Sequence, residues 1–518
     1  MAYRNRVTEL WHQGANASGM IAFERPDRRI ALCLIATALS APSLRLPAAI
    51  AAESTDPSSA TLDDVLPFRP AGLPHGGRRV FAHWHVFPIS IDNRPATEDY
   101  YTREWLTADP ATGGRTPYGA FLRERPLPRQ PRPSADWVIE DMAQDIRWAA
   151  AIGIDAFLFN IISVDPTSLY WRYFQHMLKA AAQLDGVFKI VPNLDTAILR
   201  NQPVDPIATA IASVSREPGL LRLPSGEVIL GAFMAESWPA DKWQALFDAL
   251  NSHGILISFL PTFLNTRDAK PEHFALAAAV SEWSGNFVEG IANLDTVSSH
   301  VRALGKQWCA PVWPQDSRPK DGVYGEAANS RLFRDGWMSA IRNHADFAQL
   351  ITWNDYSEAS ELRPSTGIQY SFYDLAAYYI AWFKSGQPPE IIRDVLYYFH
   401  RVQSVSSSAV GTHQRAPMAL RWGRTPVNEV ELVAFLTAPG VLEIELGGRI
   451  EQQAAAAGTT TMRTPLSMGR PSFRLKRNGE TVIDFASAFP INEIGEFQDL
   501  LYRGGSSTRA PIAGNDAK

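Results

Sequence analysis

The chain of 518 residues carries a formal net charge of −5, and 46% of its residues are hydrophobic while 20% are charged. This length exceeds one ordinary domain and fits one large barrel with a smaller domain, or two to three domains of medium size. The small negative charge supplies no strong field for nucleic acid or for an anionic membrane, so neither is an expected partner.

Residues 1–51 have the pattern of a removable secretory signal. Asp27-Arg28-Arg29 leads into the apolar run Ile30–Leu39, which is too short for a stable membrane anchor, and Ala49-Ile50-Ala51 offers a small-residue cleavage site. A buried N-terminal helix is the alternative interpretation. We expect a signal, and therefore a secreted or periplasmic bacterial protein without a stable membrane anchor.

Removal of this signal would leave a mature chain with a linker over residues 52–77 and one cysteine. If Met20 is the true start, residues 1–19 are an upstream extension. Cys33 lies in the signal, so Cys309 remains alone and cannot form an intramolecular disulfide. Two cysteines also exclude a thiolate zinc site and an iron–sulfur cluster.

From residue 78 to 405, strand-like apolar runs alternate with helix-like amphipathic segments. Ile154–Ile162 is almost continuously apolar, which is typical of a strand buried on both faces. Eight strand-then-helix units predict an α/β fold with a parallel sheet closed into a (β/α)8 TIM barrel. An open doubly wound sheet is the alternative, but no glycine-rich phosphate turn follows the first strand.

The expected barrel strands are Arg79–Phe87, Ile154–Ile162, Phe188–Leu194, Val228–Met234, Ile255–Phe259, Phe287 or the run just before it, Trp308–Trp313 and Phe347–Trp353. The expected helices cover residues 136–151, 168–184, 203–214, 240–252, 272–280, 293–304, 326–345 and 371–385.

The pattern of the sequence changes after the expected barrel. Glu390–Gln403 is expected to form a last helix packed on the barrel. Residues 406–503 contain short alternating strands separated by turns such as Asn478-Gly479, and they predict a small antiparallel β-sandwich. Residues 504–518 are expected to be a disordered tail. The sandwich strands are expected at residues 429–435, 441–446, 472–477 and 481–485.

Polar and aromatic side chains follow the expected barrel strands at their carboxyl ends, where the active sites of such barrels lie. Amide, carboxylate and indole groups would converge there, as a polyhydroxylated ligand requires. These candidate residues are His83, His85, Asn160, Asp165, Asn193, Asp195, Glu236, Trp283, Trp313, Trp353, Asn354, Asp355, Tyr356 and Glu358.

Several candidates also have a purely structural interpretation. His83 and His85 alternate along one strand and face the same side, so they are either a metal pair or hydrogen-bonded barrel histidines. Asp165 before a proline can start a turn, and Asp195 can cap a helix. Glu236 stands where a loop would join a helix.

Asp355 and Glu358 have a chemical reason to lie together. Glycoside hydrolysis needs one carboxyl group to protonate the leaving oxygen and another to activate water or attack carbon. A spacing of three residues in a turn can place both groups on one side of a cleft, and a neighbouring charge raises the pKa of the acid. Binding of a divalent cation is the alternative. Glu361 is the nearest third carboxylate, but it lies beyond the strand end and is expected to be a solvated charge.

The segment Trp353-Asn354-Asp355-Tyr356-Ser357-Glu358 closely resembles the Trp-Asn-Asp-Tyr-Gly-Glu-Ser motif of glycoside hydrolase family 71, the α-1,3-glucanases or mutanases. Phe81-Ala82-His83 resembles the opening strand of that family. Ala151–Phe157 and Ala310-Pro311-Val312 resemble its second and seventh units. The order and spacing match across residues 79–402, and Lys476–Val482 is similar more loosely.

This resemblance implies a (β/α)8 catalytic domain with an accessory β-sandwich. It also implies endo-type cleavage of α-1,3-glucan with inversion at the anomeric carbon, without a cofactor. Matched position by position, the carboxylate pair of the family falls on Asp355 and Glu358, and a further acidic residue falls on Asp195. Glu358 is then assigned as general acid and Asp355 as the base for water. Asp195 would orient the water or hold a hydroxyl group.

The motif also departs from the family pattern. Ser357 replaces a glycine, Ala359 replaces a serine, and the insertion over residues 92–133 is long. A related α-glucan or a bacterial exopolysaccharide is therefore an alternative substrate. Alternatives to hydrolysis of α-1,3-glucan are a non-catalytic carbohydrate-binding or exopolysaccharide-processing barrel, and a metal-dependent hydrolase that uses His83 and His85.

Overall fold

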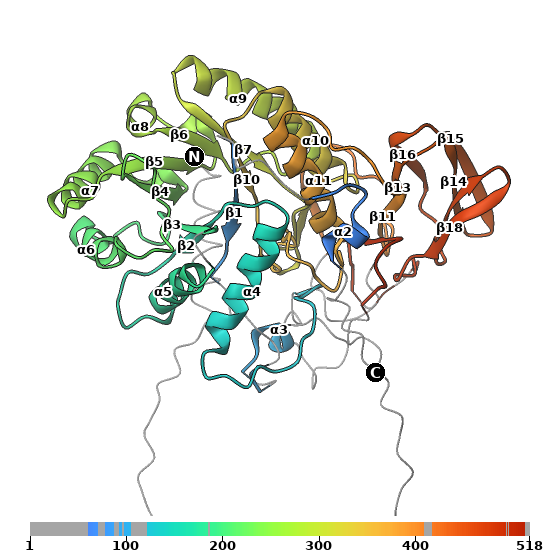
Figure 1. Ribbon diagram of the computed structural model, residues 1–518, viewed down its shortest axis with the longest axis horizontal. Coiled ribbons are helices and arrows are strands. Elements are labelled where there is room, and N and C mark those ends of the chain that lie inside the picture. The colour runs from blue at the N-terminus through green and yellow to red at the C-terminus, as the bar shows by residue number, and fades with distance from the viewer. Residues whose placement is uncertain are drawn as a thin grey trace, which may run out of the picture. The chain divides into compact units, whose positions relative to one another are not determined.

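A computed structural model gives the fold shown in Figure 1. The residues it describes are 61–70, 78–86, 93–95, 98–104, 122–184, 187–408, 417–493, 495 and 497–512. The expected signal over residues 1–51, most of the expected linker and much of the insertion after the first strand lie outside the described residues.

Eight parallel strands close into a barrel, with β1 hydrogen-bonded to both β2 and β10. The predicted TIM barrel is confirmed, and the sixth strand is the run just before Phe287. The barrel strands are β1 (Arg79–Trp84), β2 (Ala156–Ile161), β3 (Lys189–Asp195), β4 (Val228–Phe233), β5 (Ile257–Phe263), β6 (Ala279–Glu282), β7 (Gln307–Val312) and β10 (Phe347–Leu350).

Helices surround the barrel strands (Figure 1). They bury their apolar faces against the outer face of the sheet, which is why the strands are apolar on both sides. These helices are α4 (Trp137–Ala151), α5 (Leu169–Ala182), α6 (Val204–Val214), α7 (Ala240–Ser252), α8 (Pro271–Leu276), α9 (Ile291–Ala303), α10 (Arg331–Arg342) and α11 (Ser371–Ser385).

The barrel interior changes from apolar to polar along the strands. Leu158 pairs with Val191 in register, and both belong to an apolar cluster inside the barrel. Two residues further along, Asn160 pairs with Asn193. Because side chains alternate with a period of two, these amides face the same interior as the apolar layer. The polar site therefore begins inside the barrel, toward the carboxyl ends of the strands.

Two antiparallel sheets follow the barrel and enclose a second apolar core, as the sequence predicts. The strands of the first sheet are β16 (Gly458–Pro465), β13 (Glu429–Leu436), β11 (Val395–Arg401) and β19 (Tyr502–Ser506). The strands of the second sheet are β15 (Arg449–Ala455), β14 (Gly440–Leu446), β17 (Ser472–Arg477) and β18 (Glu480–Ala486).

The helix expected over Glu390–Gln403 is wrong, because Val395–Arg401 forms strand β11 and pairs with β13 and β19. The C-terminal sheet thus includes residues before the expected boundary at residue 405. The expected tail also begins inside a strand, and Arg509 forms an ion pair of 2.7 Å with buried Asp374. Residues 513–518 lie outside the described residues.

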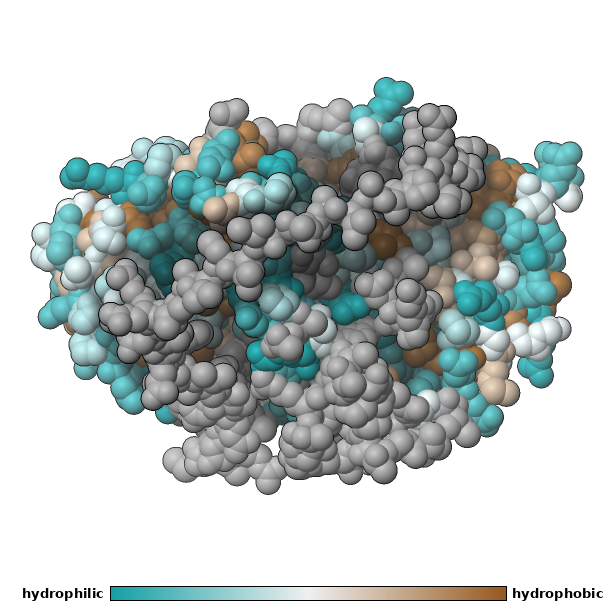
Figure 2. Space-filling model, turned by 90° about the horizontal axis from the view of Figure 1, so that it is seen from below, coloured by the Kyte–Doolittle hydropathy of each residue, from teal (hydrophilic) through white to brown (hydrophobic). Residues whose placement is uncertain are grey.

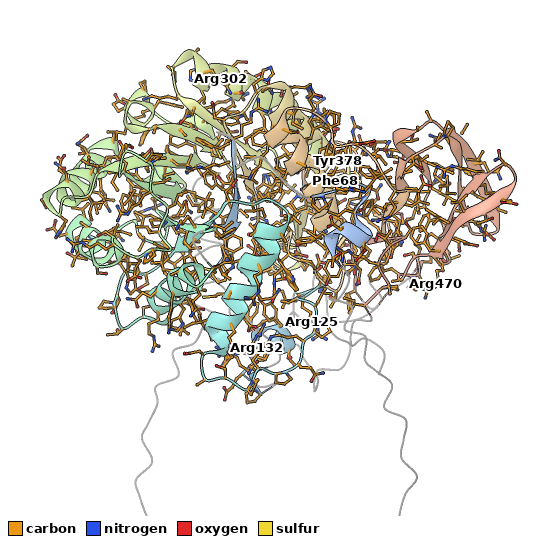
Figure 3. All side chains as sticks on the ribbon, in the orientation of Figure 1. Phe68, Arg125, Arg132, Arg302, Tyr378 and Arg470 are labelled. Atoms are coloured by element: carbon orange, nitrogen blue, oxygen red, sulfur yellow. The ribbon has the colours of Figure 1, made fainter. Side chains whose placement is uncertain are left out.

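Part of the expected linker packs on the barrel. Leu62–Val65 forms the short helix α2, and Phe68 lies edge-on to Tyr378 of α11 at a centroid distance of 5.7 Å (Figure 3). Phe68 is buried because it covers the apolar face of α11.

A third, small sheet was not predicted. It consists of β8 (Ser317–Arg318), β9 (Val323–Gly325) and β12 (Ala419–Trp422), in the order β12-β9-β8. It joins the loop after β7 to the C-terminal part of the chain.

Among the described residues, no helix combines the length and the apolar character needed to cross a membrane.

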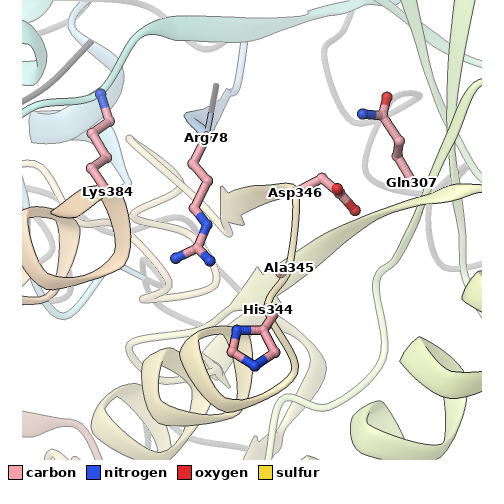
Figure 4. A pocket seen from close by; sticks show the side chains of 6 residues that line it. All are labelled: Arg78, Gln307, His344, Ala345, Asp346 and Lys384. Atoms are coloured by element: carbon pink, nitrogen blue, oxygen red, sulfur yellow. The ribbon is translucent and has the colours of Figure 1, made fainter. Parts of the chain in front are cut away.

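A hollow of about 460 Å3 lies at the N-terminal ends of β1, β7 and β10. It is lined by Arg78, Gln307, His344, Ala345, Asp346 and Lys384 (Figure 4). It is at the opposite end of the strands from the candidate residues.

Candidate active site

The loop after β10 folds around the carboxylate of Asp355. Asp355 Oδ1 accepts hydrogen bonds from Ser357 N at 3.0 Å, Ser357 Oγ at 2.7 Å and Glu358 N at 3.2 Å. Thr352 Oγ1 in turn accepts from Asp355 N at 2.9 Å. The serine that replaces the glycine of the family motif therefore adds a donor to Asp355. One carboxylate oxygen shapes the turn, while Asp355 Oδ2 faces His85 Nε2 at 4.0 Å.

Asp355 keeps its negative charge although it is buried. Burial alone would raise the pKa of this carboxyl group. The fields of His85, Lys320 and Arg318, together with the hydrogen bond from Ser357, outweigh burial and hold the pKa below its ordinary value. The group is therefore an ionised carboxylate at neutral pH.

Glu358 is buried in the same loop but is held in the opposite state. Burial raises its pKa to about 8, Asp355 and Asp316 add to this, and Arg318 and Lys320 oppose it. Arg318 NH2 lies 2.9 Å from Glu358 Oε2. Glu358 thus carries a proton at neutral pH, and the loop presents one proton acceptor beside one proton donor.

The loop after β7 supplies the two cations, and sequence reasoning missed both. Arg318 Nε and NH2 each lie 2.8 Å from an oxygen of Asp316, which also accepts from Asn286 Nδ2 at 2.7 Å. Lys320 Nζ lies 3.5 Å from Ser357 Oγ. Asp316 and Asn286 were recognisable as strand-end residues, but only the return of this loop onto the eighth strand shows what Arg318 and Lys320 do.

A second polar row lies at the ends of β2 and β3. Asn160 Nδ2 donates to Asp195 Oδ2 at 3.2 Å, and Asn193 Nδ2 donates to Asn160 Oδ1 at 3.4 Å. Asp195 Oδ1 accepts from Ile198 N at 3.1 Å, so it also caps the following turn. Burial raises the pKa of Asp195 to about 6. The structural role expected for Asp195 is thus met in a turn, and its role toward a ligand stays a prediction.

His83 belongs to an aromatic cluster inside the barrel. Its ring lies 4.9 Å from Trp283, which lies 4.6 Å from Phe233 and 5.4 Å from Trp313. Burial lowers the pKa of His83 to about 3, and burial also lowers the pKa of His85. The His83 imidazole is therefore neutral at pH 7. Within the described ranges, no group of three or more His, Cys, Asp or Glu side chains is arranged to hold a metal.

Three motif residues are buried and support the loop. Trp353 is fully buried in the main core, 5.3 Å from Phe157, and so does not wall a cleft. The Asn354 side chain accepts from His85 N at 2.7 Å and donates to His85 O at 2.9 Å. Tyr356 packs edge-on against Tyr101 at 5.6 Å.

Two other candidates, Asp165 and Glu236, follow the carboxyl ends of barrel strands, and they differ in exposure. Asp165 is exposed and accepts from Thr167 N and Oγ1, each at 2.8 Å, which is a turn that starts before a helix. Glu236 Oε1 accepts from Leu264 N at 2.9 Å, and burial raises the pKa of Glu236 to about 7. Its Oε2 is buried without a hydrogen-bond partner among the described residues. Glu236 can therefore accept a ligand hydroxyl, whereas Asp165 is occupied by its own turn.

The expectation that Glu361 is a solvated charge is wrong. Glu361 is 1% exposed and lies near the carboxyl group of Glu124, which accepts from Ser365 Oγ at 2.8 Å. The pKa of Glu361 is well above its ordinary value because of burial and the neighbouring charge of Glu124.

The surface near the segment that follows β1 is hydrophilic. Helix α3 (Tyr100–Arg103) lies at the bottom of Figure 1, and Figure 2 shows the molecule from that side. Hydrophilic residues are frequent among the described residues of this face, with some hydrophobic residues between them (Figure 2). Such a surface suits a polyhydroxylated ligand.

Comparison with known proteins agrees with the motif in the loop after β10. The family model described as Glycosyl hydrolase family 71 matches residues 132–496. Mutanase Pc12g07500 of Penicillium rubens is 26% identical over 386 residues, which is 69% of this chain and 83% of that protein. Glucan endo-1,3-alpha-glucosidase agn1 of Schizosaccharomyces pombe is 22% identical over 395 residues, which is 71% of this chain and 91% of that protein.

Among solved structures, a GH99 endo-alpha-mannosidase from Bacteroides thetaiotaomicron superposes with a TM-score of 0.46 at 13% identity. The match covers 60% of this chain and 98% of the mannosidase.

Proposed function

Because the chain belongs to glycosyl hydrolase family 71, we propose that it cleaves α-1,3-glucosidic linkages inside a polysaccharide, with inversion at the anomeric carbon. The relatives named mutanase and glucan endo-1,3-alpha-glucosidase support this substrate and the endo action. A related α-glucan or exopolysaccharide is the alternative substrate.

The observation that carries the proposal is the placement of two buried carboxyl groups in one loop, with His85 Nε2 4.0 Å from Asp355 Oδ2 and Arg318 NH2 2.9 Å from Glu358 Oε2. Asp355 is held ionised, and Glu358 is held protonated. In the reaction, Asp355 Oδ2 takes a proton from water while the water oxygen bonds to the anomeric carbon. Glu358 gives its proton to the glycosidic oxygen as the bond between that oxygen and the anomeric carbon breaks. Inversion by this route needs the two carboxyl groups about 6.5–9.5 Å apart, with water between them.

The row of Asn160, Asn193 and Asp195 would hold hydroxyl groups of the sugar beside the cleaved bond. Amide groups can donate and accept, and the second oxygen of a carboxylate accepts, so together they match adjacent hydroxyls. Trp283 is partly exposed and would contribute an apolar ring to the sugar site.

The same proposal places the enzyme outside the cytoplasm of a bacterium. The support is the pattern of Arg28-Arg29, the apolar run Ile30–Leu39 and the small residues Ala49-Ile50-Ala51. N-terminal sequencing of protein recovered from the medium or periplasm checks this, and a mature start near Ala52 is expected.

The test incubates the purified chain with α-1,3-glucan and with other α-glucans, and measures reducing ends and the anomer released first by proton NMR. The expected result is fast internal cleavage of α-1,3-glucan with the β-anomer formed first. The matched control is the double variant Asp355→Asn/Glu358→Gln, which reports any contaminating activity. A chelator should leave the rate unchanged if the mechanism is as proposed.

Each alternative has its own outcome. Binding of glucan without any release of reducing ends would replace the proposal with a non-catalytic carbohydrate-binding protein. Loss of activity with chelator would favour a metal-dependent hydrolase that uses His83 and His85. The α-anomer as first product would contradict inversion.

A further inference from the structure

The main chain and the side chain of Glu358 are both held by the short strand β8. Ser317 N donates to Glu358 O at 2.8 Å, and Arg318 NH2 lies 2.9 Å from Glu358 Oε2. The position of this carboxyl group is therefore set from outside its own loop, by two consecutive residues.

A strand of two residues cannot hold such a geometry alone, because isolated short ladders are marginally stable in water. β8 pairs with β9 through Ser317 with Tyr324 and Arg318 with Val323. β9 pairs on its other side with β12, which comes from the C-terminal part of the chain about a hundred residues later. The C-terminal segment thus completes the sheet that holds Glu358.

β12 ends in a tryptophan that touches the same arginine. The Arg318 guanidinium carbon lies 4.9 Å from the centroid of the Trp422 ring, within the range of a cation–π contact. Trp422 O also accepts from Glu326 N at 2.9 Å. At Gly325, an added Cβ would lie 2.9 Å from Asn286 O and 3.7 Å from Trp422 Cβ. The sheet is therefore packed closely against the strand ends that carry the site.

We propose that Trp422 is a positioning residue for the reaction: it fixes Arg318, and Arg318 fixes the place and the proton affinity of Glu358. The proposal rests on the proposed function, since it assumes that Glu358 is the general acid. It makes the C-terminal part of the chain a structural component of the active site and not a separable accessory module.

The sign of the expected pH effect follows from the charges around Glu358. Arg318 and Lys320 are the cations facing it, and Asp316 and Asp355 are the anions. A loosened Arg318 stabilises the carboxylate less, so Glu358 would keep its proton to higher pH. The alkaline limb of the kcat profile should then move upward. At the same time kcat should fall, because the acid is both weaker and less well placed.

The experiment compares Trp422→Leu and Trp422→Phe in the full-length chain. Trp422→Leu should lower kcat about tenfold with little change in KM. It should also shift the alkaline limb upward by about half a pH unit or more. Trp422→Phe keeps an aromatic face and should restore most of both effects. The matched control is Phe383→Leu, which removes a ring 5.4 Å from the Arg78 guanidinium at the opposite end of the barrel. This control should reduce stability without moving the limb.

A double-mutant cycle separates positioning from a general loss of structure. In the Arg318→Gln background, Trp422→Leu should produce no further shift of the limb, whereas a merely structural role would give additive effects. If Trp422→Leu does not fold, the cycle is run with Trp422→His. An unchanged limb and kcat in Trp422→Leu, together with an inactive Glu358→Gln, would overturn the proposal and leave the function standing. A fully active Glu358→Gln would overturn the function itself.

Discussion

Two pairs of buried carboxyl groups, Asp355 with Glu358 and Glu361 with Glu124, are in different chemical states. Asp355 and Glu358 share a loop with the cations of Arg318 and Lys320 nearby, so one is ionised and the other has a pKa of about 8. Glu361 follows three residues later and is paired with Glu124. For Glu361, burial and the carboxylate of Glu124 both raise the pKa, and it holds a proton well above its ordinary range.

The difference shows that burial alone does not make a catalytic pair. Burial keeps a carboxyl group protonated, as in Glu361. A base needs opposing positive charge strong enough to overcome burial, as at Asp355, and an acid needs a pKa near the working pH, as at Glu358. The cations after β7 distinguish the proposed catalytic pair, because they overcome burial at Asp355. At Glu124 the Arg503 guanidinium also lowers the pKa, but burial outweighs it and the pKa stays raised.

The largest expected effect comes from neutralising each member of the two pairs in turn. Asp355→Asn should lower kcat/KM on α-1,3-glucan by about 10²–10⁴-fold, because the amide cannot take the proton from water. Glu358→Gln should lose as much on glucan but much less on a substrate with an acidic phenol leaving group, which needs no proton. Glu361→Gln should stay within about twofold of the wild type. A large loss in Glu361→Gln with unchanged folding would break the distinction between the pairs.

The pH profile gives the next largest effect. Since the pKa of Glu358 is about 8, kcat/KM should fall about tenfold per pH unit above that value as the acid loses its proton. Asp355 has a pKa below its ordinary value, so its own ionisation should not limit the rate near neutral pH. Initial rates in buffers of constant ionic strength measure the profile, and Glu361→Gln should leave the limb in place. If the apparent pKa of the alkaline limb lies more than about 1.5 units from 8, the environment described for Glu358 is contradicted.

The sequence could predict those parts of the structure that local periodicity determines. The alternation of apolar runs with amphipathic segments depends on local periodicity, so it predicted the barrel and placed the carboxyl ends of its strands. The segment Val395–Arg401 was misassigned because its apolar residues fit a buried helix as well as a strand, and only the pairing with β13 and β19 decides between them.

Within the site, the residues that the sequence could find are those carried by strand ends. Asp355, Glu358 and Asp195 follow or end apolar runs, so the sequence could name them as candidates. The cations Arg318 and Lys320 act through a loop that returns to a distant strand. Glu361 is buried because Glu124, far away in the sequence, lies against it. Contacts of this kind leave no periodic signal in a single sequence.

A smaller effect is expected on stability, and its sign follows from the raised pKa of Glu361. The folded chain keeps the Glu361 proton above the pH at which the unfolded chain loses it, so the free energy of unfolding should fall as pH rises. Glu361→Gln mimics the protonated group and removes this dependence. In urea unfolding, the free energy of unfolding of Glu361→Gln should exceed that of the wild type. This difference should grow by about 1 kcal/mol per pH unit above the ordinary glutamate pKa, until Glu361 itself ionises. The exposed Glu217→Gln is the control and should show no such trend, and a constant advantage from pH 5 to 8.5 would mean that the pair does not hold a proton.

The smallest expected effect separates a buried rim carboxylate from an exposed one. Asp165 and Asp195 both follow barrel strands, but Asp165 is exposed and occupied by hydrogen bonds from Thr167, while Asp195 is buried against Asn160. Asp165→Ala should therefore leave kcat/KM on α-1,3-glucan within about twofold, whereas Asp195→Ala should lower it about tenfold or more. Steady-state rates at pH 7 measure both, and circular dichroism confirms that both variants fold. A strong loss in Asp165→Ala would extend the sugar site outward onto the turn before α5, and it would show that burial beside amide donors is not needed for a binding role at this rim.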